Sequence, residues 1–340
     1  MNMMMECFPQ KLSGILGNMT GKRIAVIGDI ILDRYIRGSV ERISPEAPIP
    51  IVQAQETFVR LGGAANVMQN VIALGGAAFA FGIVGDDDAG HEVISQLCRN
   101  KIECSGVIPA VTRETTVKTR ILSGSQQLLR IDKENTSPIN DDQKELLIVR
   151  LTRLLADNQI DAVVLEDYAK GVLDQEISQA IVDTANHYGV FSLLDPNPRN
   201  HMRVEKLTVL KPNCRELWAL GGVLPSSNRA DLVRAASTIM QDWEIENLVL
   251  TLAQDGILLF SRTGDPAGSA LPAVAREVYD VSGAGDTVIA VTAMALAAHA
   301  EIREAVLLGN LAAGIAVGKL GTSTVSSLEI QQELAKNNLS

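Results

Sequence analysis

The sequence predicts an α/β fold with a mostly parallel central sheet, helices on both of its faces, and a small β-lid outside it. Three observations predict this fold. Short apolar runs recur along the chain, helix-length amphipathic segments separate them, and two stretches of alternating residues interrupt this rhythm. Strands of a parallel sheet are covered by helices on both faces, so their sequences are apolar throughout rather than alternating.

The first apolar run, Arg23-Ile-Ala-Val-Ile-Gly28, is typical of a buried strand that stops at a functional loop, because Asp29 follows it directly. Further strands are expected at 78–84, 162–165, 190–194, 207–210 and 248–252. Helices are expected at 141–157, 174–188 and 229–241. Strands that alternate with helices at this spacing indicate a parallel sheet built from βαβ units.

Residues 36–60 and 113–132 carry short alternating segments, which suit strands with one solvated face. We expect these segments to form the lid, although a pair of ordinary edge hairpins would show the same alternation. Residues 1–21 are expected to be a short N-terminal extension. Residues 22–335 are expected to form one domain, to which the lid strands belong.

Composition excludes several classes of protein. Hydrophobic residues make up 46% and charged residues 21% of the 340 residues, which is ordinary for a globular protein with a full core. The net charge of −10 argues against a sequence-independent nucleic-acid binder, which needs a basic face to displace counterions. We expect no secretion signal, and no apolar run reaches the ~18 residues that suggest a membrane span. The four cysteines lack disulfide or zinc-ligand spacing, which favours free thiols and a cytoplasmic location.

The strongest candidate for a site is Asp280-Val-Ser-Gly-Ala-Gly-Asp-Thr287, which precedes an apolar helical run at 288–299. In an open α/β sheet, ligands bind where strands end and helices begin. Glycines allow close approach, and the free N–H groups of a helix start attract an anion. Asp286 lies in the expected first turn, where a carboxylate can accept a proton from an attacking hydroxyl. Taken alone, the glycines also fit a plain turn, and Asp286 fits a helix cap.

Other candidate residues also follow expected strands. Asp29 and Asp33 come directly after the first strand, and Gly62-Gly63-Ala-Ala-Asn66 opens a helix. Two carboxylates and an amide suit a polyhydroxy ligand, because each sugar hydroxyl both donates and accepts hydrogen bonds. Capping by Asp33 and a turn at the glycines explain the same pattern equally well.

Three further polar segments follow apolar strands: Asp167-Tyr-Ala-Lys-Gly171, Asp195-Pro-Asn197 and Lys211-Pro-Asn-Cys-Arg-Glu216. A lysine at a strand end can pair with phosphate, although a solvated lysine is the usual case. Residues 314–320 approximate a P-loop but have three residues instead of four between the glycines, so helix packing is the favoured interpretation. No Gly-x-Gly-x-x-Gly follows the first strand, which argues against a dinucleotide-binding dehydrogenase.

Taken together, these segments resemble the ribokinase or PfkB family of sugar kinases, from about residue 22 to residue 329. Asp280-Val-Ser-Gly-Ala-Gly-Asp-Thr287 is similar to the family's C-terminal signature, and Gly62-Gly63-Ala-Ala-Asn66 is similar to its N-terminal one. Within the family, several elements are similar to the D-glycero-D-manno-heptose 7-phosphate kinases: Gly28-Asp-Ile-Ile-Leu-Asp-Arg-Tyr35, Arg42-Ile-Ser-Pro-Glu-Ala-Pro48, Gln126-Gln127, Arg130 with Asp132, Asp167-Tyr-Ala-Lys-Gly171 and Val317-Gly-Lys-Leu-Gly-Thr-Ser-Thr-Val325.

The resemblance implies a ribokinase-like fold whose lid often helps to form a dimer, so a homodimer is expected. It implies ATP as the phosphoryl donor together with Mg2+, while a requirement for a monovalent cation stays open. Asp286 would be the base that deprotonates the anomeric hydroxyl, and Gly283, Ala284 and Gly285 would supply the anion hole. The implied product is a heptose 1,7-bisphosphate, an intermediate toward the ADP-heptose of lipopolysaccharide.

The resemblance also assigns the remaining candidates. Those expected to bind the sugar phosphate are Asp29, Asp33, Gly62, Gly63, Asn66, Arg120, Lys170 and Asp195. Those expected to bind the nucleotide are Asn213, Glu216, Thr251 and Gly256, with Glu216 also near the metal. Candidates for the cations that a substrate phosphate needs are Arg42, Arg120, Arg130, Lys170 and Arg199.

The chain departs from many relatives at three points. Asn197 stands where they have lysine, Glu166 stands where a small residue is common, and no nucleotidyltransferase domain is expected before residue 340. Alternatives therefore stay open. They are a kinase of the same family for another sugar or a nucleoside, a catalytically silent sugar-binding protein and, more distantly, a dehydrogenase.

Overall fold

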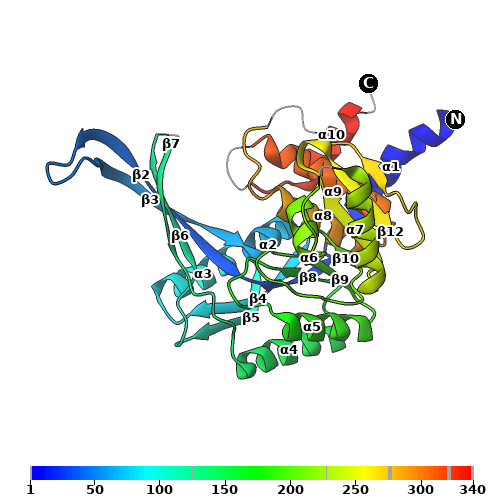
Figure 1. Ribbon diagram of the computed structural model, residues 1–340, viewed down its shortest axis with the longest axis horizontal. Coiled ribbons are helices and arrows are strands. Elements are labelled where there is room, and N and C mark those ends of the chain that lie inside the picture. Colours follow the sequence, from blue (N-terminus) through cyan, green and yellow to red (C-terminus); the bar gives the residue numbers. More distant parts are fainter. Residues whose placement is uncertain (1, 125, 227, 275–277, 320–322, 338–340) are drawn as a thin grey trace.

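The computed structural model describes residues 2–124, 126–226, 228–274, 278–319 and 323–337. Within these residues, a nine-stranded sheet forms the centre of a body, and a four-stranded sheet stands apart from it. Figure 1 shows the small sheet projecting from the body as an arm. The two sheets therefore separate the chain into a helix-covered body and an exposed arm.

The large sheet is mostly parallel, which confirms the prediction. In spatial order its described strands are β13 (Ser269–Leu271), β12 (Ile257–Ser261), β11 (Asn247–Thr251), β10 (Val209–Leu210), β9 (Phe191–Asp195), β8 (Ala162–Glu166), β1 (Arg23–Gly28), β4 (Ala77–Gly85) and β5 (Glu103–Ala110). Neighbouring strands from β5 to β11 in this order are parallel, whereas β12 and β13 are antiparallel.

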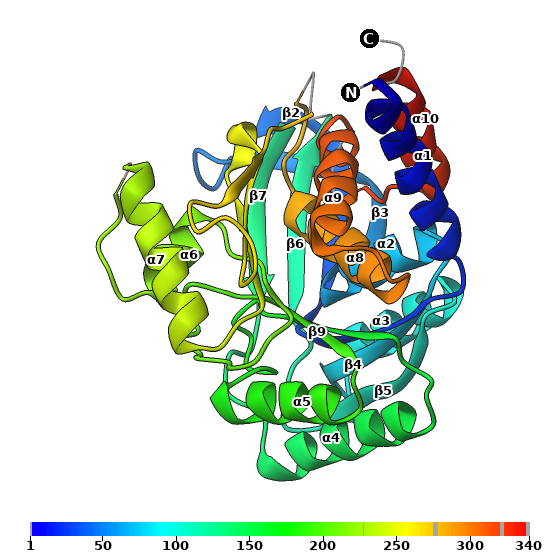
Figure 2. The same cartoon turned by 90° about the vertical axis from the view of Figure 1, so that its right-hand side faces the viewer.

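Helices cover both faces of the large sheet, as expected. One face carries α1 (Asn2–Asn18), α2 (Ala64–Ala73), α3 (Asp88–Arg99), α8 (Ala284–Ala297), α9 (Ile302–Val317) and α10 (Ser327–Asn337). The other carries α4 (Asp141–Ala156), α5 (Gln175–His187), α6 (Cys214–Leu220) and α7 (Arg229–Asp242). Successive side chains of β1 explain the two cores, because Ile24 and Val26 enter the first whereas Ala25 and Ile27 enter the second. Figure 2 shows α4 and α5 on the opposite side of the body from α8 and α9.

The N-terminal segment forms helix α1, which lies beside α10 (Figure 2). Leu12, Ile15, Leu16 and Met19 are buried in the same core as α8. The domain boundary at residue 22 stays a prediction, but this part of the chain packs with the body.

The arm consists of β2 (Ile30–Ile43), β3 (Pro50–Gly63), β6 (Val117–Ser123) and β7 (Gln126–Lys133), in the order β3-β2-β6-β7. Strands β2 and β3 form an antiparallel hairpin, and β6 lies parallel to β2. Because these strands make their own sheet, the alternating segments are a separate small sheet and not edge hairpins of the large one. A single residue, Asp29, separates the end of β1 from the start of β2. Asp29 therefore lies where the arm joins the body.

The carboxyl ends of the central strands place several polar residues at one edge of the sheet. Gly28 of β1 is in register with Glu166 of β8, which is in register with Asp195 of β9. The chain moves from β1 toward β4 on one side and continues from β8 on the other, so the strand order reverses beside β1. Such a reversal is where ligands bind in open α/β sheets.

Candidate active site

Asp286 lies in the first turn of α8, as expected, and its carboxylate is held from two directions. Gly283 is the N-cap residue, with φ of 81°, in the left-handed region that favours glycine. The Asn66 Nδ2 group of α2 donates to Asp286 Oδ2, and the Tyr168 hydroxyl donates to Oδ1 at 3.0 Å. Three segments far apart in the sequence thus fix the orientation of one carboxylate.

The environment of Asp286 makes its carboxylate a stronger proton acceptor than an exposed aspartate. The residue is only 7% exposed, and burial raises the pKa of its carboxyl above the ordinary value. The hydrogen bonds from Asn66 and Tyr168, and the charge of Lys211, oppose that rise. A carboxylate that is raised in pKa but held ionised by such partners is suited to act as a general base.

Glu166, Asp195 and Asp286 form an acidic cluster at the strand ends. Each offers a carboxylate oxygen within 4.8 Å of the others. Burial, and then the Asp195 and Asp286 charges, raise the pKa of Glu166 well above its usual range. Among the described residues, Glu166 Oε2 is buried and has no hydrogen-bond partner. An all-oxygen donor set with a free buried oxygen has the chemistry that a hard divalent cation requires.

Lys211 offsets part of this negative charge. Its ammonium is buried and lies 2.8 Å from Asp195 Oδ2. Burial raises the pKa of Asp195 to about 7, while the Lys211 charge lowers it. A Cβ on Gly285 would come within 3.1 Å of Lys211 Nζ, so the glycine allows the first turn of α8 to lie against this pair. Lys211 is therefore not a solvated lysine, because it is buried and paired with the Asp195 carboxylate.

The expected anion-hole residues are the N-terminal residues of α8. N–H groups of a first helical turn have no acceptor within the helix and lie at the positive end of its dipole. The N–H group of Ala284 donates to the Val281 carbonyl at 3.3 Å. The structure thus places Gly283, Ala284 and Gly285 next to Asp286 at the helix start.

Asp33, Gly62 and Arg120 lie together where the arm meets the body. Arg120 Nη1 donates to Asp33 Oδ1 at 2.6 Å. A Cβ on Gly62 would come within 2.7 Å of Asp33 Oδ2. Gly63 has φ of 61°, and a Cβ there would come within 2.3 Å of the Asp29 carbonyl oxygen, so only glycine fits. The glycine pair thus allows β3 to approach both carboxyl-bearing residues.

Asp29 differs from Asp33, because hydrogen bonds from backbone N–H groups occupy its carboxylate. Its carboxylate accepts the N–H groups of Tyr168 at 3.0 Å, Lys170 at 2.9 Å and Val172 at 3.2 Å. The carboxylate therefore holds the loop after β8, which carries Tyr168 to Asp286. Lys170 lies in the same loop, and its ammonium is 2.7 Å from Glu134 Oε2.

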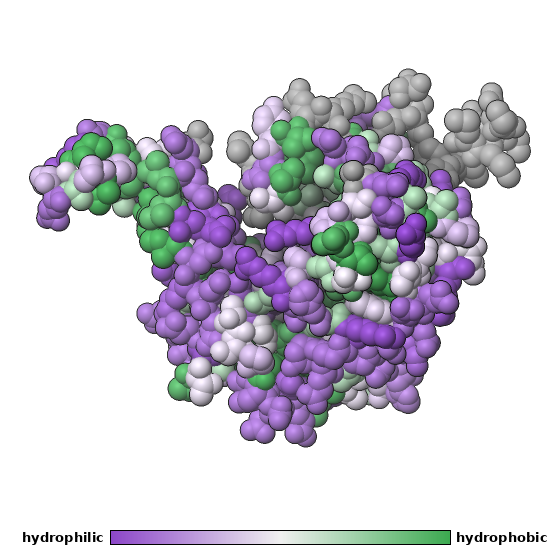
Figure 3. All heavy atoms as spheres, in the orientation of Figure 1, coloured by the Kyte–Doolittle hydropathy of each residue, from purple (hydrophilic) through white to green (hydrophobic). Residues whose placement is uncertain are grey.

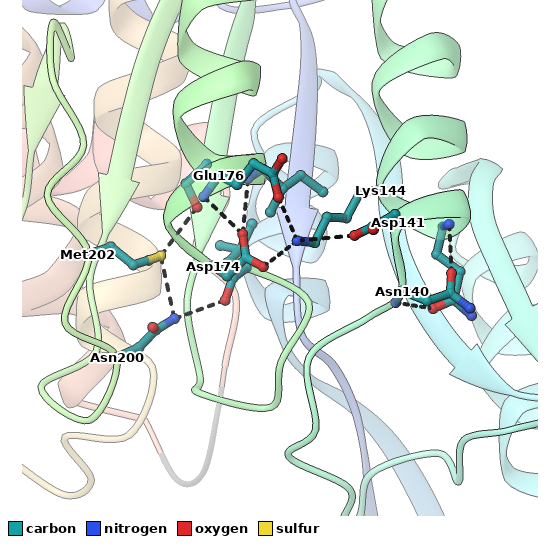
Figure 4. Close-up of polar contacts among 11 residues, drawn as sticks. Asn140, Asp141, Lys144, Asp174, Glu176, Asn200 and Met202 are labelled. Carbon is teal, nitrogen blue, oxygen red and sulfur yellow. Dashed lines mark hydrogen bonds and ion pairs between the residues drawn. The ribbon is translucent and has the colours of Figure 1, made fainter.

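The loop after β9 is anchored by a polar network around the start of α5 (Figure 4). Asn200 Nδ2 donates to the Leu173 carbonyl at 2.9 Å, and the Ser178 hydroxyl donates to Met202 Sδ at 3.3 Å. Beside it, Lys144 Nζ lies 2.8 Å from Asp174 and 2.9 Å from Glu176.

The anchored loop contains Asn197. Asn197 Nδ2 donates to the Asp167 carbonyl at 3.4 Å. The side chain at this position therefore joins the loop after β9 to the loop after β8.

Three of the four expected nucleotide-binding residues lie together at the ends of β10 and β11. Asn213 and Glu216 cap α6 reciprocally, with Asn213 N donating to Glu216 Oε2 at 2.7 Å and Glu216 N donating to Asn213 Oδ1 at 3.0 Å. Thr251 forms a parallel bridge with Asn213. Gly256, with φ of 87°, follows the short helix η1 (Ala253–Asp255) and lies against the Leu271 carbonyl.

A hollow of about 370 Å³ lies between α9, α10 and the segment that precedes the 280–287 motif. Its lining is largely apolar: Val274, Tyr279, Leu311, Gly314, Ile315, Gly318 and Glu333. Apolar walls with a few polar groups are typical of sites for flat organic ligands. Gly314 lies in α9, as its interpretation as a helix residue predicts, and also lines this hollow.

Buried Asp167 gives a pH-dependent prediction. Burial raises the pKa of its carboxyl to about 7, against the lowering effect of a hydrogen bond from Ala169 N. A group whose pKa is raised on folding contributes stability that is complete below the unfolded pKa, about 4, and lost as pH rises through the folded value. Replacing Asp167 with asparagine should therefore flatten the decline in unfolding free energy between about pH 4 and pH 7, by up to about 1.4 kcal/mol per pH unit.

Urea unfolding measured across this pH range tests the prediction. The matched control is Asp183→Asn, an exposed acid on α5, which should keep the wild-type pH profile. Identical slopes for wild type and Asp167→Asn would show that Asp167 does not titrate in this range.

The fold and the sequence together define the class of ATP-dependent carbohydrate kinases. The chain belongs to the pfkB family carbohydrate kinases, whose sequence profile matches residues 22–329. Curated relatives include the bifunctional protein HldE of Wolinella succinogenes, 39% identical over 320 residues that cover 94% of this chain and 66% of that protein. The protein of the same name from Helicobacter pylori strain 26695 is 40% identical over 310 residues, which cover 91% of this chain and 66% of that protein. The chain thus spans just under two thirds of the length of these relatives.

Solved structures agree with the fold. A ribokinase of Arabidopsis thaliana complexed with ribose and ATP has a TM-score of 0.70 at 18% identity, covering 93% of this chain and 99% of that one. Phosphofructokinase-2 of Escherichia coli in complex with potassium has a TM-score of 0.75 at 19% identity, covering 94% of this chain and 100% of that one. Within the described residues, no helix has the length and apolar character needed to cross a membrane.

Proposed function

We propose that the protein transfers the γ-phosphoryl group of ATP to the anomeric hydroxyl of D-glycero-D-manno-heptose 7-phosphate. The observation that carries the proposal is the buried Asp286 carboxylate, held by Asn66 and Tyr168 at the start of α8. The heptose assignment is supported by the segments similar to heptose 7-phosphate kinases and by 39% identity to a protein named HldE.

In the proposed mechanism, Asp286 accepts the proton of the sugar hydroxyl as that oxygen attacks the γ-phosphorus. A bond forms between the sugar oxygen and phosphorus, and the bond from phosphorus to the bridging oxygen breaks, releasing ADP. Asn66 and Tyr168 keep the carboxylate oriented, which preserves the reacting geometry. The first-turn amides of α8 face the negative charge that builds on the transferring group.

The nucleotide and metal have residues of suitable chemistry. The apolar hollow beside Tyr279 fits the base of ATP, and Asn213 with Thr251 lies at the strand ends, within the edge that would hold the phosphates. Mg2+ would be held by carboxylate oxygens. The candidates are Glu166 and Asp195 of the acidic cluster, together with Glu216, which the sequence resemblance suggests. When bound, the ion neutralises charge on the phosphate oxygens. Lys211 orients Asp195, and its charge lowers the pKa of that carboxyl.

Release of ADP, measured across sugars with and without a terminal phosphate, tests the proposed function. With ATP and Mg2+, turnover should be strong for D-glycero-D-manno-heptose 7-phosphate and weak for sugars that lack the phosphate. Preferred turnover of an unphosphorylated sugar or a nucleoside would keep the kinase but overturn the heptose assignment. Absence of sugar-dependent ADP release would overturn both.

We also infer that the arm joins two copies of the chain. Figure 3 shows hydrophobic residues gathered on the arm, where Ile43, Ile49, Leu129 and Ile131 are exposed. Apolar residues grouped on a projecting sheet are suited to an interface. This inference predicts a homodimer. Analytical ultracentrifugation of the purified chain, which gives the mass of the species in solution, tests the prediction.

A further inference from the structure

One face of the arm concentrates charged residues. Asp33 of β2 is in register with Lys118 of β6, which is in register with Asp132 of β7. Arg120 of β6 is in register with Arg130 of β7. Residues directly opposite on paired strands, and residues two apart on one strand, point to the same face. All five side chains therefore share the face that carries Asp33.

This face meets the loop after β8. Lys170 in that loop pairs with Glu134, the residue directly after β7. Burial, and then the charges of Lys170 and Arg130, lower the pKa of Lys118, while the charges of Asp33 and Asp132 raise it. Lys170 is itself buried, at 6% exposure. We call Lys118, Arg120, Arg130 and Lys170 the cationic cluster, since their charges converge where the arm and the body meet.

Three members of the cationic cluster already have carboxylate partners. Arg120 pairs with Asp33 at 2.6 Å and Lys170 pairs with Glu134 at 2.7 Å. Arg130 pairs with Asp132 through two contacts of 2.8 and 3.0 Å. Lys118 differs, because it makes neither an ion pair nor a side-chain hydrogen bond to any residue that the structure describes. The cluster as a whole thus has one positive charge in excess. Arg60, which is in register with Asp33 and lies over the Tyr35 and Phe58 rings, is a further cation on this face without an ion pair to any described residue.

The position of Lys118 makes that excess charge available to a ligand. The residue is half-buried, and burial is the main cause that lowers the pKa of its ammonium. A cation without a partner in such a place is unfavourable, and an anion that binds there relieves the cost. A phosphate group supplies two negative charges and three acceptor oxygens, which suits several cations at once.

The cationic cluster also lies at a suitable place relative to Asp286. Tyr168 contacts Asp286 through its hydroxyl, and Lys170 follows two residues later in the same loop. The Cα atoms of two residues this close in sequence lie at most ~7 Å apart, so the loop that contacts Asp286 also places Lys170 close to the site. Asn197, at the position where relatives have lysine, is instead bonded to the Asp167 carbonyl.

We propose that Lys118 binds the terminal phosphate of the sugar substrate and is the residue that determines preference for a phosphorylated sugar. This inference rests on the proposed function, and it names a residue that the sequence motifs do not identify. Arg120, Arg130 and Lys170 surround the bound phosphate, while their carboxylate partners limit how far they move toward it.

Steady-state kinetics of Lys118→Met test the inference with heptose 7-phosphate and with the same sugar lacking the phosphate. The KM for the phosphorylated sugar should rise about 10–100-fold, the range of a lost charge-assisted hydrogen bond, while kcat changes little. The KM for the unphosphorylated sugar should stay unchanged, and Lys118→Arg should restore part of the loss. An equal rise for both sugars, or no rise, overturns the inference.

The control is Lys133→Met, which removes the same charge from the opposite face of the arm. Lys133 is in register with Val117 and pairs with Glu114 in solvent. This variant should keep wild-type KM values for both sugars.

A second measurement does not depend on turnover. Inorganic phosphate should slow acetylation of Lys118, but not of Lys133, as followed by mass spectrometry of the intact enzyme. Equal labelling of Lys118 with and without phosphate overturns the inference. If phosphate protects Lys118 while wild type phosphorylates no sugar phosphate, the anion site stands and the proposed function fails.

Discussion

Replacing Asp286 with asparagine is expected to lower kcat by about 10²–10⁴-fold, the range attributed to general-base catalysis. The KM values for ATP and sugar should change little, because asparagine has the same shape and retains an acceptor for the Tyr168 hydroxyl. Loss of kcat with retained binding is the signature of an interaction that acts in the transition state. Single-turnover kinetics and isothermal titration with each substrate measure the two effects separately.

Two further variants sharpen this test. Tyr168→Phe keeps the base but removes one of its hydrogen bonds, so a smaller loss is expected than for Asp286→Asn. Asp157→Asn, at an exposed acid that ends α4, should match wild type. Near-normal turnover by Asp286→Asn would show that another group accepts the proton.

Replacing Lys211 with methionine is expected to lower the free energy of unfolding by about 3–5 kcal/mol, the cost of leaving a buried charge without its partner. Lys211 lies 2.8 Å from Asp195, whose carboxylate is in turn within 4.8 Å of those of Glu166 and Asp286. Without the ammonium, mutual repulsion in this buried cluster is uncompensated. Urea unfolding at pH 8 measures the effect.

The double variant Lys211→Met with Asp195→Asn provides the internal check. Removal of both charges should restore much of the lost stability, because no unpaired charge remains from the pair. Lys336→Met breaks an exposed pair with Glu333 and should cost less than about 1 kcal/mol. If Lys211→Met were as stable as Lys336→Met, the Lys211–Asp195 pair would not stabilise the fold.

The central strands were predictable because burial on both faces leaves a simple signal. Expected boundaries at 162–165 and 248–252 differ by a single residue from β8 and β11. The helix α1 was not predicted, since its sequence has no regular apolar pattern at its start and includes Pro9. It packs through Leu12 and Leu16, which a single-sequence pattern does not distinguish from exposed leucines.

The candidate site was predictable only in part. Asp286 and its glycines follow from the helix start, where the chemistry depends on the backbone. Tyr168 and Lys211 lie within recognisable motifs, yet their contacts depend on the register of β8, β9 and β10, which the sequence does not specify. Asp29 illustrates the same limit, because its position suggests sugar binding while its carboxylate accepts three loop amides.

Lys118 was not identified from the sequence, because what distinguishes it from the neighbouring cations is that it has no carboxylate partner. Arg120 and Lys170 have carboxylate partners on neighbouring segments, whereas Lys118 has none among the described residues. Only the register of the arm shows which members of the cationic cluster are neutralised and that Lys118 is the one left.

The most direct test of the account is the position of the phosphate in the product. Wild-type enzyme is incubated with ATP, Mg2+ and D-glycero-D-manno-heptose 7-phosphate, and the product is examined by phosphorus NMR. The account predicts ADP together with a second sugar phosphorus resonance that couples to the anomeric proton. A new phosphate on any other hydroxyl, or unchanged substrate after prolonged incubation with active nucleotide, would contradict it.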